Sequence, residues 1–266
     1  MSDQANQAIT ALRTGHNELA DLVSGMSPDD LTQPSGAAQW DISQVLGHLG
    51  SGAEIALATV EAALEGTGNP GPELHRSVRA RWDAMVVAPT ERAAGFLRAN
   101  EALVRRFETL DDTTRAQLRI DLGFLPEPVD VATAAGLRLS EFAYHTWDIT
   151  VAFDPAAVLA PAAAELLVDS LGVIIGFLGH ADALDGRQVS LLVQTTAPDR
   201  SFGLDLHHAV TLVDVPQQSD GVLSAPGEAW LRLAAGRLAL QHTPPTVHLT
   251  SEAITLDDLR RVFPGF

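Results

Sequence analysis

The chain has 266 residues, 46% of them hydrophobic, and is long enough to form one large domain or two ordinary ones. Its 34 acidic residues outnumber 17 basic residues and give a formal net charge of −17. Because nucleic-acid binding depends on Lys and Arg neutralising phosphates, this balance argues against nucleic acid as a partner.

The sequence contains no cysteine. It therefore has no disulfide, no Cys-ligated zinc and no Cys nucleophile. Any metal ion must be held by His, Asp or Glu, and any thiol chemistry must use a thiol brought from outside. Every basic residue is Arg, which together with abundant Ala and Gly indicates GC-rich codon usage and an actinobacterium-like source. No run of about 18 apolar residues occurs and the first residues are polar, so we expect a cytoplasmic protein without a membrane partner.

The first 155 residues are predicted to form a four-helix bundle, because four segments place apolar residues at helical spacing. These helices are expected at about residues 3–24, 41–65, 90–110 and 130–152. A loop is expected at residues 66–73, which are rich in Gly and Pro. The arginines of the third helix, Arg92 among them, are interpreted as a solvated face.

The second helix has a clear start and an inward histidine. Asp41 can cap it, with Gln44 completing a capping box, and Trp40 can pack against Val45 as a hydrophobic staple. His48 lies on the same stripe as Val45 and Leu49, so it points inward. Two interpretations stay open: a core histidine bonded to a backbone carbonyl, or a metal ligand or acid–base group.

Residues 156–266 are predicted to form a smaller α+β domain, so that the chain as a whole is α+β. Helices are expected at about 162–178, 226–240 and 255–262, and strands at 189–196, 202–215 and 246–250.

Glu141 and His145 stand four residues apart on the fourth predicted helix, so both side chains lie on one face. Chance supplies such pairs in an acidic chain; His248 and Glu252 form another, in a predicted strand and loop. With His48, however, the helical pair makes a possible set of two histidines and one carboxylate. Such a set leaves coordination positions open, as catalytic zinc sites do.

Two segments carry a resemblance to a known family. Residues 40–49, WDISQVLGHL, and residues 141–149, EFAYHTWDI, are similar to the two signatures of the mycothiol-dependent maleylpyruvate isomerase family. That family belongs to the DinB/YfiT-like superfamily of metal-binding four-helix bundles. The resemblance covers residues 1–155 with specific motifs. Residues 156–266 resemble the family's C-terminal domain more weakly, through Gly236, Arg237 and overall length.

The resemblance implies that His48, Glu141 and His145 hold a divalent metal, usually zinc, and that the metal binds the thiol of mycothiol and lowers its pKa. The thiolate would add to the C=C bond of maleylpyruvate, rotation would follow, and elimination would give the trans isomer. Other relatives are thought to transfer mycothiol onto electrophiles.

The family's C-terminal domain supplies an arginine to the active site, and Arg237 is the best candidate here, as a fork for a carboxylate. Its alternative is an arginine that serves the end of a helix. Asp148 either orients a ligand histidine or is exposed. An ion pair between Arg138 and Glu141 would place Glu141 on the surface and defeat the metal hypothesis.

We therefore expect a zinc-dependent, mycothiol-using isomerase or S-transferase acting on a small electrophile. The alternatives are a thiol-independent bundle metalloenzyme, such as a hydrolase or cyclase, and a non-catalytic member that binds a ligand. The substrate and the oligomeric state do not follow from the sequence.

Overall fold

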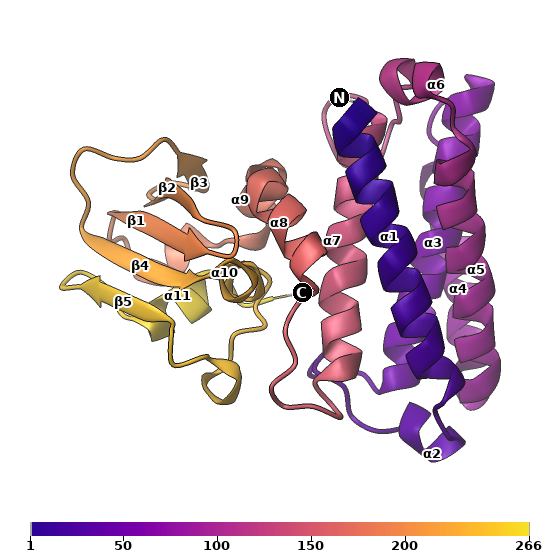
Figure 1. Ribbon diagram of the computed structural model, residues 1–266, viewed down its shortest axis with the longest axis horizontal. Coiled ribbons are helices and arrows are strands. Elements are labelled where there is room, and N and C mark those ends of the chain that lie inside the picture. Colours follow the sequence, from indigo (N-terminus) through magenta and orange to yellow (C-terminus); the bar gives the residue numbers. More distant parts are fainter. Residues whose placement is uncertain (1, 266) are drawn as a thin grey trace. The chain divides into compact units, whose positions relative to one another are not determined.

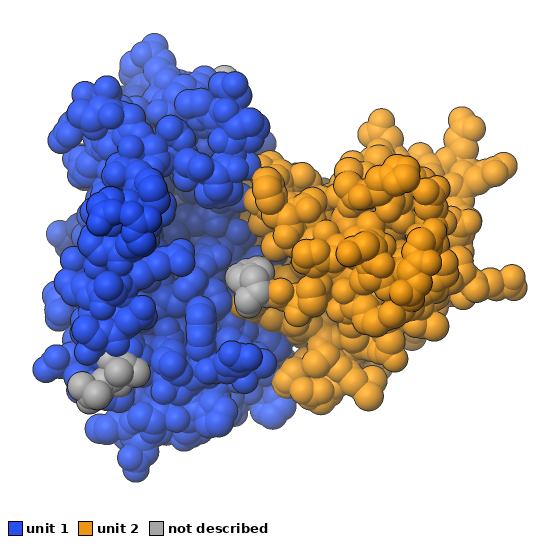
Figure 2. All heavy atoms as spheres, turned by 180° about the vertical axis from the view of Figure 1, so that it is seen from behind, with its two compact units in different colours: residues 1–157 blue, residues 158–266 orange. Residues whose placement is uncertain are grey.

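The computed structural model describes residues 2–265 of the chain. The chain divides into two compact units, residues 1–157 and residues 158–266 (Figure 2). The domain boundary expected from the sequence lies between residues 155 and 156, and as a statement about independent domains it stays a prediction.

Four long helices build the first unit: α1 (Ser2–Ser24), α3 (Ile42–Glu65), α5 (Pro89–Thr109) and α7 (Val131–Thr150). Helix α1 packs against α5 and α7, and α3 packs against the same two helices, so the four close into a bundle (Figure 1). The predicted α+β class, with a helical N-terminal part, is confirmed. Long apolar side chains from all four helices fill the core, among them Leu12, Leu19, Leu46, Leu49, Phe96, Leu103 and Leu139.

Shorter elements complete this unit: α2 (Pro28–Leu31), α4 (Gly71–Asp83), the 3-10 turn η1 (Ala84–Val87) and α6 (Asp112–Gln117). The predicted loop at 66–73 is wrong in its last residues, because α4 begins at Gly71. A proline in the first turn of a helix lacks only an N–H that has no intrahelical partner, so Pro72 is compatible with this start. Trp82 of α4 lies against Gly50 of α3.

The second unit contains a five-stranded sheet: β1 (Val189–Thr196), β2 (Arg200–Leu206), β3 (Val210–Val213), β4 (Gly221–Pro226) and β5 (His248–Ser251). The strand order is β3-β2-β1-β4-β5. Strands β1 and β4 are parallel, with Val193 opposite Leu223, and the other three pairings are antiparallel. The single strand expected at 202–215 is wrong: it is a hairpin of β2 and β3. Strand β4 was not predicted.

Helical segments complete this unit: α8 (Pro161–Ser170), η2 (Leu171–Val173), α9 (Ile175–Leu178), η3 (Ala181–Leu184), α10 (Gly227–Ala234), η4 (Leu240–His242) and α11 (Leu256–Val262). The helix expected at 162–178 is broken into three pieces. The helix expected at 226–240 ends early because Gly236 takes a left-handed conformation with φ of 71°. Trp230 of α10 is fully buried, and its ring centroid lies 5.8 Å from that of Phe202 and 6.1 Å from that of Phe263.

Within residues 2–265, no helix combines the length and the apolar character needed to cross a bilayer.

Candidate metal centre

Helix α3 places His48 through a well-defined start. The Asp41 side chain accepts a hydrogen bond from the Gln44 backbone N–H at 2.7 Å, and the Gln44 side chain accepts one from the Asp41 N–H at 2.9 Å. This capping box confirms the predicted N-terminus. Val45 and Leu49 are fully buried on the stripe that follows. His48 lies beside that stripe with 29% of its side chain exposed, so it faces the edge of the core.

Helix α7 places Glu141 and His145 one turn apart on one face, as their spacing predicts. The Asp130 side chain caps this helix by accepting from the Thr133 N–H at 2.8 Å. His145 is 2% exposed, whereas the Glu141 side chain is 34% exposed.

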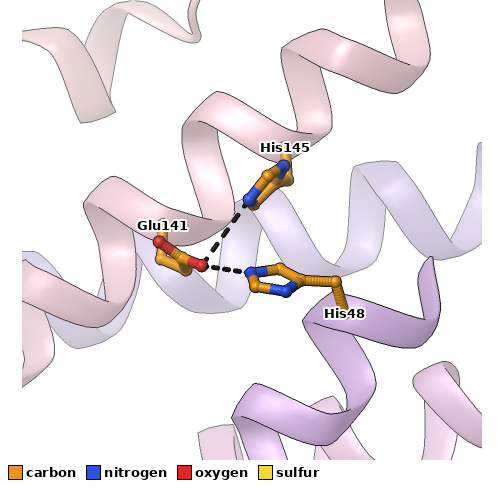
Figure 3. A group of neighbouring side chains, drawn as sticks. All are labelled: His48, Glu141 and His145. Atoms are coloured by element: carbon orange, nitrogen blue, oxygen red, sulfur yellow. Dashed lines mark hydrogen bonds and ion pairs between the residues drawn. The ribbon is translucent and has the colours of Figure 1, made fainter. Parts of the chain in front are cut away.

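The three side chains point toward one another between α3 and α7 (Figure 3). Nε2 of His48 lies 2.5 Å from Oε1 of Glu141, and Nε2 of His145 lies 3.6 Å from the same oxygen. One donor atom from each residue falls within 4.8 Å of the other two. Two imidazole nitrogens and one carboxylate are the donor set of open catalytic zinc sites, so these residues fit a divalent metal ion.

The electrostatics of Glu141 favour its charged form. Burial raises the pKa of the carboxyl, but hydrogen bonds from His145 and His48 outweigh burial and hold that pKa well below its usual range. The Glu141 side chain is therefore a carboxylate at neutral pH, which is the form that a metal ion requires.

Arg138, one turn before Glu141 on α7, makes no ion pair with it among the described residues. Its Nη2 instead donates to the Leu49 carbonyl at 2.9 Å and to the Asn100 side-chain oxygen at 3.0 Å. Burial lowers the pKa of Arg138 to about 10, and the charge of Glu141 partly offsets that effect. The arrangement that would have defeated the metal hypothesis therefore does not form.

Asp148 holds the ring of His145. It is fully buried, and its Oδ2 lies 2.8 Å from Nδ1 of His145. Nδ1 of His145 therefore donates to the Asp148 carboxylate, and in the neutral ring that a metal ion would require, Nε2 would offer its lone pair to that ion. Of the two alternatives for Asp148, the structure has the buried, orienting one.

Trp40 is a member of this site that the sequence did not assign to it. Its ring centroid lies 5.0 Å from that of His48 and 6.0 Å from that of His145, while the two imidazoles are 4.6 Å apart. The residue is 36% exposed, so an aromatic ring that reaches the surface lies beside both histidines. Its place just before the helix cap and at the start of the first family signature is the signal in the sequence, which predicts a staple for it and no role in the site.

Other candidates have different surroundings. His248 and Glu252, at and just after β5, join no cluster of potential ligands among residues 2–265. Arg237 is 7% exposed, and its Nη1 donates to the Ala235 carbonyl at 2.8 Å, near the end of α10. This contact is compatible with an arginine that serves the helix end, and the role of Arg237 in catalysis stays a prediction.

The fold and the three converging side chains define a helical bundle with a candidate metal centre between two of its helices. Comparison with known families then places it more narrowly. Residues 12–150, just over half of the chain, match the family described as the mycothiol maleylpyruvate isomerase N-terminal domain. The chain belongs to this family, which confirms the resemblance seen in the sequence.

Two solved structures share the fold across both units. They are a mycothiol-dependent maleylpyruvate isomerase and a histidine-to-alanine mutant of that enzyme. Each is 17% identical to this chain with a TM-score of 0.62, and each alignment covers 92% of both chains. A comparison with curated proteins finds no sequence match.

Proposed function

We propose that this protein is a metal-dependent enzyme that uses mycothiol to act on a small electrophile, with cis–trans isomerisation of a maleylpyruvate-like substrate as its reaction. Transfer of mycothiol onto the electrophile is the closest variant of this chemistry. The observation that carries the proposal is the convergence of His48, Glu141 and His145 in a chain of this family.

The donor set favours zinc. Imidazole nitrogen and carboxylate oxygen are common zinc ligands, and three protein ligands leave a position for an exogenous group. A zinc ion held there supplies positive charge that lowers the pKa of a thiol brought to it. Because the chain has no cysteine, that thiol belongs to a cofactor or co-substrate.

The protein's own residues orient the metal ligands and bind the substrate. Asp148 fixes the His145 ring through Nδ1, and the ionised Glu141 supplies the negative ligand. Trp40 packs beside the two imidazoles and adds an apolar surface to the site. Arg237 is proposed to bind a carboxylate of the substrate, since a guanidinium fork matches a carboxylate in shape and charge.

The proposal is tested by incubating the zinc-loaded protein with maleylpyruvate, with and without mycothiol, and following the trans isomer. Isomerisation that requires both zinc and mycothiol is the expected result. Accumulation of a mycothiol adduct would instead identify a transferase. Turnover without any thiol would reject the proposed mechanism and favour a thiol-independent metalloenzyme, and a protein that binds no metal would favour a ligand-binding role.

A further inference from the structure

A pocket of about 370 Å³ opens beside His48 within the first unit. His48 and Trp40 of the candidate centre belong to its lining, together with Trp82, Arg79 and Arg92. The pocket therefore adjoins the candidate metal centre at His48, and its charged lining consists of two arginines and one carboxylate, that of Asp83.

Arg92 is the unexpected member of this lining. The sequence placed it on a solvated face, and that prediction is wrong: it is 4% exposed. Gly47 explains the difference, because a Cβ at Gly47 would stand 2.7 Å from Cδ of Arg92. The absence of a side chain at Gly47 lets the stem of Arg92 lie across α3, next to His48.

The buried guanidinium of Arg92 forms no ion pair with any carboxylate in the part of the chain that the structure describes. Its Nη1 reaches the Ser43 hydroxyl at 3.3 Å and its Nη2 reaches the Trp82 carbonyl at 3.5 Å, both long contacts to neutral groups. Its Nε is buried without an acceptor, and so is the indole Nε1 of Trp82 in the same lining.

A buried guanidinium with these contacts lowers the stability of the folded protein unless a bound ligand supplies the missing partner. A buried charge without a partner destabilises the folded state, and a buried donor without an acceptor adds to that cost. A ligand carboxylate would offset both, since it accepts two parallel hydrogen bonds from a guanidinium. Exposed Arg79 and exposed Asp83 add one charge of each sign at the same pocket, so Arg92 is its buried cation.

We propose that this pocket is the subsite for a carboxylate of the electrophilic substrate, and that Arg92 is the residue that binds it. The proposal rests on the proposed function, because it assigns the substrate to the cavity beside His48. It makes the substrate class an organic acid whose carboxylate lies against Arg92 while its reactive carbon faces the candidate centre.

The experiment measures binding of maleate, a small dicarboxylate, to the full-length protein by calorimetry and by tryptophan fluorescence. It is run after removal of metal with a chelator, so that no metal ion contributes to maleate binding. Arg92→Gln removes the charge. Arg98→Gln is the matched control, because Arg98 is an exposed arginine on the same helix that does not line this pocket. The dimethyl ester of maleate is the uncharged probe.

Saturable binding of maleate but not of the ester is expected. Arg92→Gln should weaken maleate binding roughly 10- to 100-fold, the range for losing hydrogen bonds to a charged group, and Arg98→Gln should leave it unchanged. Wild-type protein that fails to bind maleate, or an Arg92→Gln variant that binds it as the wild type does, overturns the proposal.

A second variant keeps the proposal testable if Arg92→Gln does not fold. Gly47→Ala keeps the charge but displaces the stem of Arg92, so a folded Gly47→Ala protein with unchanged maleate affinity also overturns the proposal. Failure of the subsite proposal and failure of the proposed function give different results. Arg92-dependent maleate binding in a protein without mycothiol-dependent turnover rejects the function alone. A mycothiol-dependent enzyme whose Arg92→Gln variant keeps the wild-type KM rejects the subsite alone.

Discussion

Asp148 is the residue on which the orientation of His145 depends. The imidazole of His145 is buried, and the 2.8 Å contact from its Nδ1 to Asp148 determines which way Nε2 faces. Carboxylates that hold a ligand histidine in this way set both the tautomer and the basicity of the ring.

We predict that Asp148→Asn lowers zinc affinity about 10- to 100-fold, the usual effect of losing an outer partner of a metal ligand. A competition titration against a chromophoric chelator measures this affinity. Asp130→Asn is the control, because asparagine caps α7 as well as aspartate does. Equal affinities for wild type and Asp148→Asn would show that Asp148 does not support the centre.

Some residues in and around the candidate centre could be predicted from the sequence, and others could not. Asp41, Gln44 and His48 were predictable because a capping box and an apolar stripe are local signals. Arg92 was not, because its burial depends on Gly47, which lies on another helix. An arginine's charge favours solvent, and only the tertiary contact reverses that preference.

Helix α4 packs against α3 at Gly50, where the Trp82 ring lies over the missing side chain. A Cβ on Gly50 would collide with the ring of Trp82, whereas a Cβ on Gly136 of α7 would meet no atom within 4 Å. We therefore expect opposite effects of the same substitution. Gly50→Ala should lower the free energy of unfolding by about 1–3 kcal/mol through overpacking. Gly136→Ala should raise it by about 0.5–1 kcal/mol, because alanine favours the helix interior.

Urea unfolding followed by the helical signal compares the two alanine variants with the wild type. If Gly50→Ala proved as stable as Gly136→Ala, the close packing of α4 on α3 described above would be wrong.

Helices α1 and α5 are joined by charges. Arg13 donates to Glu101 at 2.5 Å and to Glu108 at 2.8 Å. Hydrogen bonds from Arg13 lower the pKa of both carboxyls. A lowered carboxyl pKa contributes stability that is present above the unfolded value and is lost as the pH falls through the folded one.

We predict that the first unit loses stability as the pH falls below about 4.5, near the pKa of a glutamate in an unfolded chain. Arg13→Gln should remove about 1 kcal/mol at pH 7, a value discounted for solvent screening, and should flatten this acid dependence. The control is Arg76→Gln, whose ion pair with Glu73 is largely exposed and should contribute less. Parallel pH profiles of Arg13→Gln and wild type would contradict the prediction.

At the scale of elements, the long helices of the first unit were predictable and the sheet of the second was less so. Helix α3 carries its own start signal and a periodic stripe, both local. Strand β4, Gly221–Pro226, is short and contains residues that disfavour strands, and it forms by parallel pairing with β1. That pairing is non-local, so no short-range pattern announces it.

The centre depends on the fold of the whole first unit. His48 and Glu141 are 93 positions apart in sequence, yet their side chains meet because α3 and α7 pack against each other. The sequence could propose the three residues from helix faces and from the family's motifs. It could not supply the distances, the contact of Trp40 with both imidazoles or the buried guanidinium of Arg92, since each of these is set by packing between helices.

The zinc affinity of His48→Ala tests the central claim most directly. Wild-type protein should bind one zinc ion per chain, and His48→Ala should bind it more than about 100-fold less tightly, beyond the effect of losing an outer partner. His248→Ala, which removes an exposed histidine from the other His/Glu pair, should bind as the wild type does. A His48→Ala protein that keeps the wild-type zinc content and affinity would contradict the assignment of the centre.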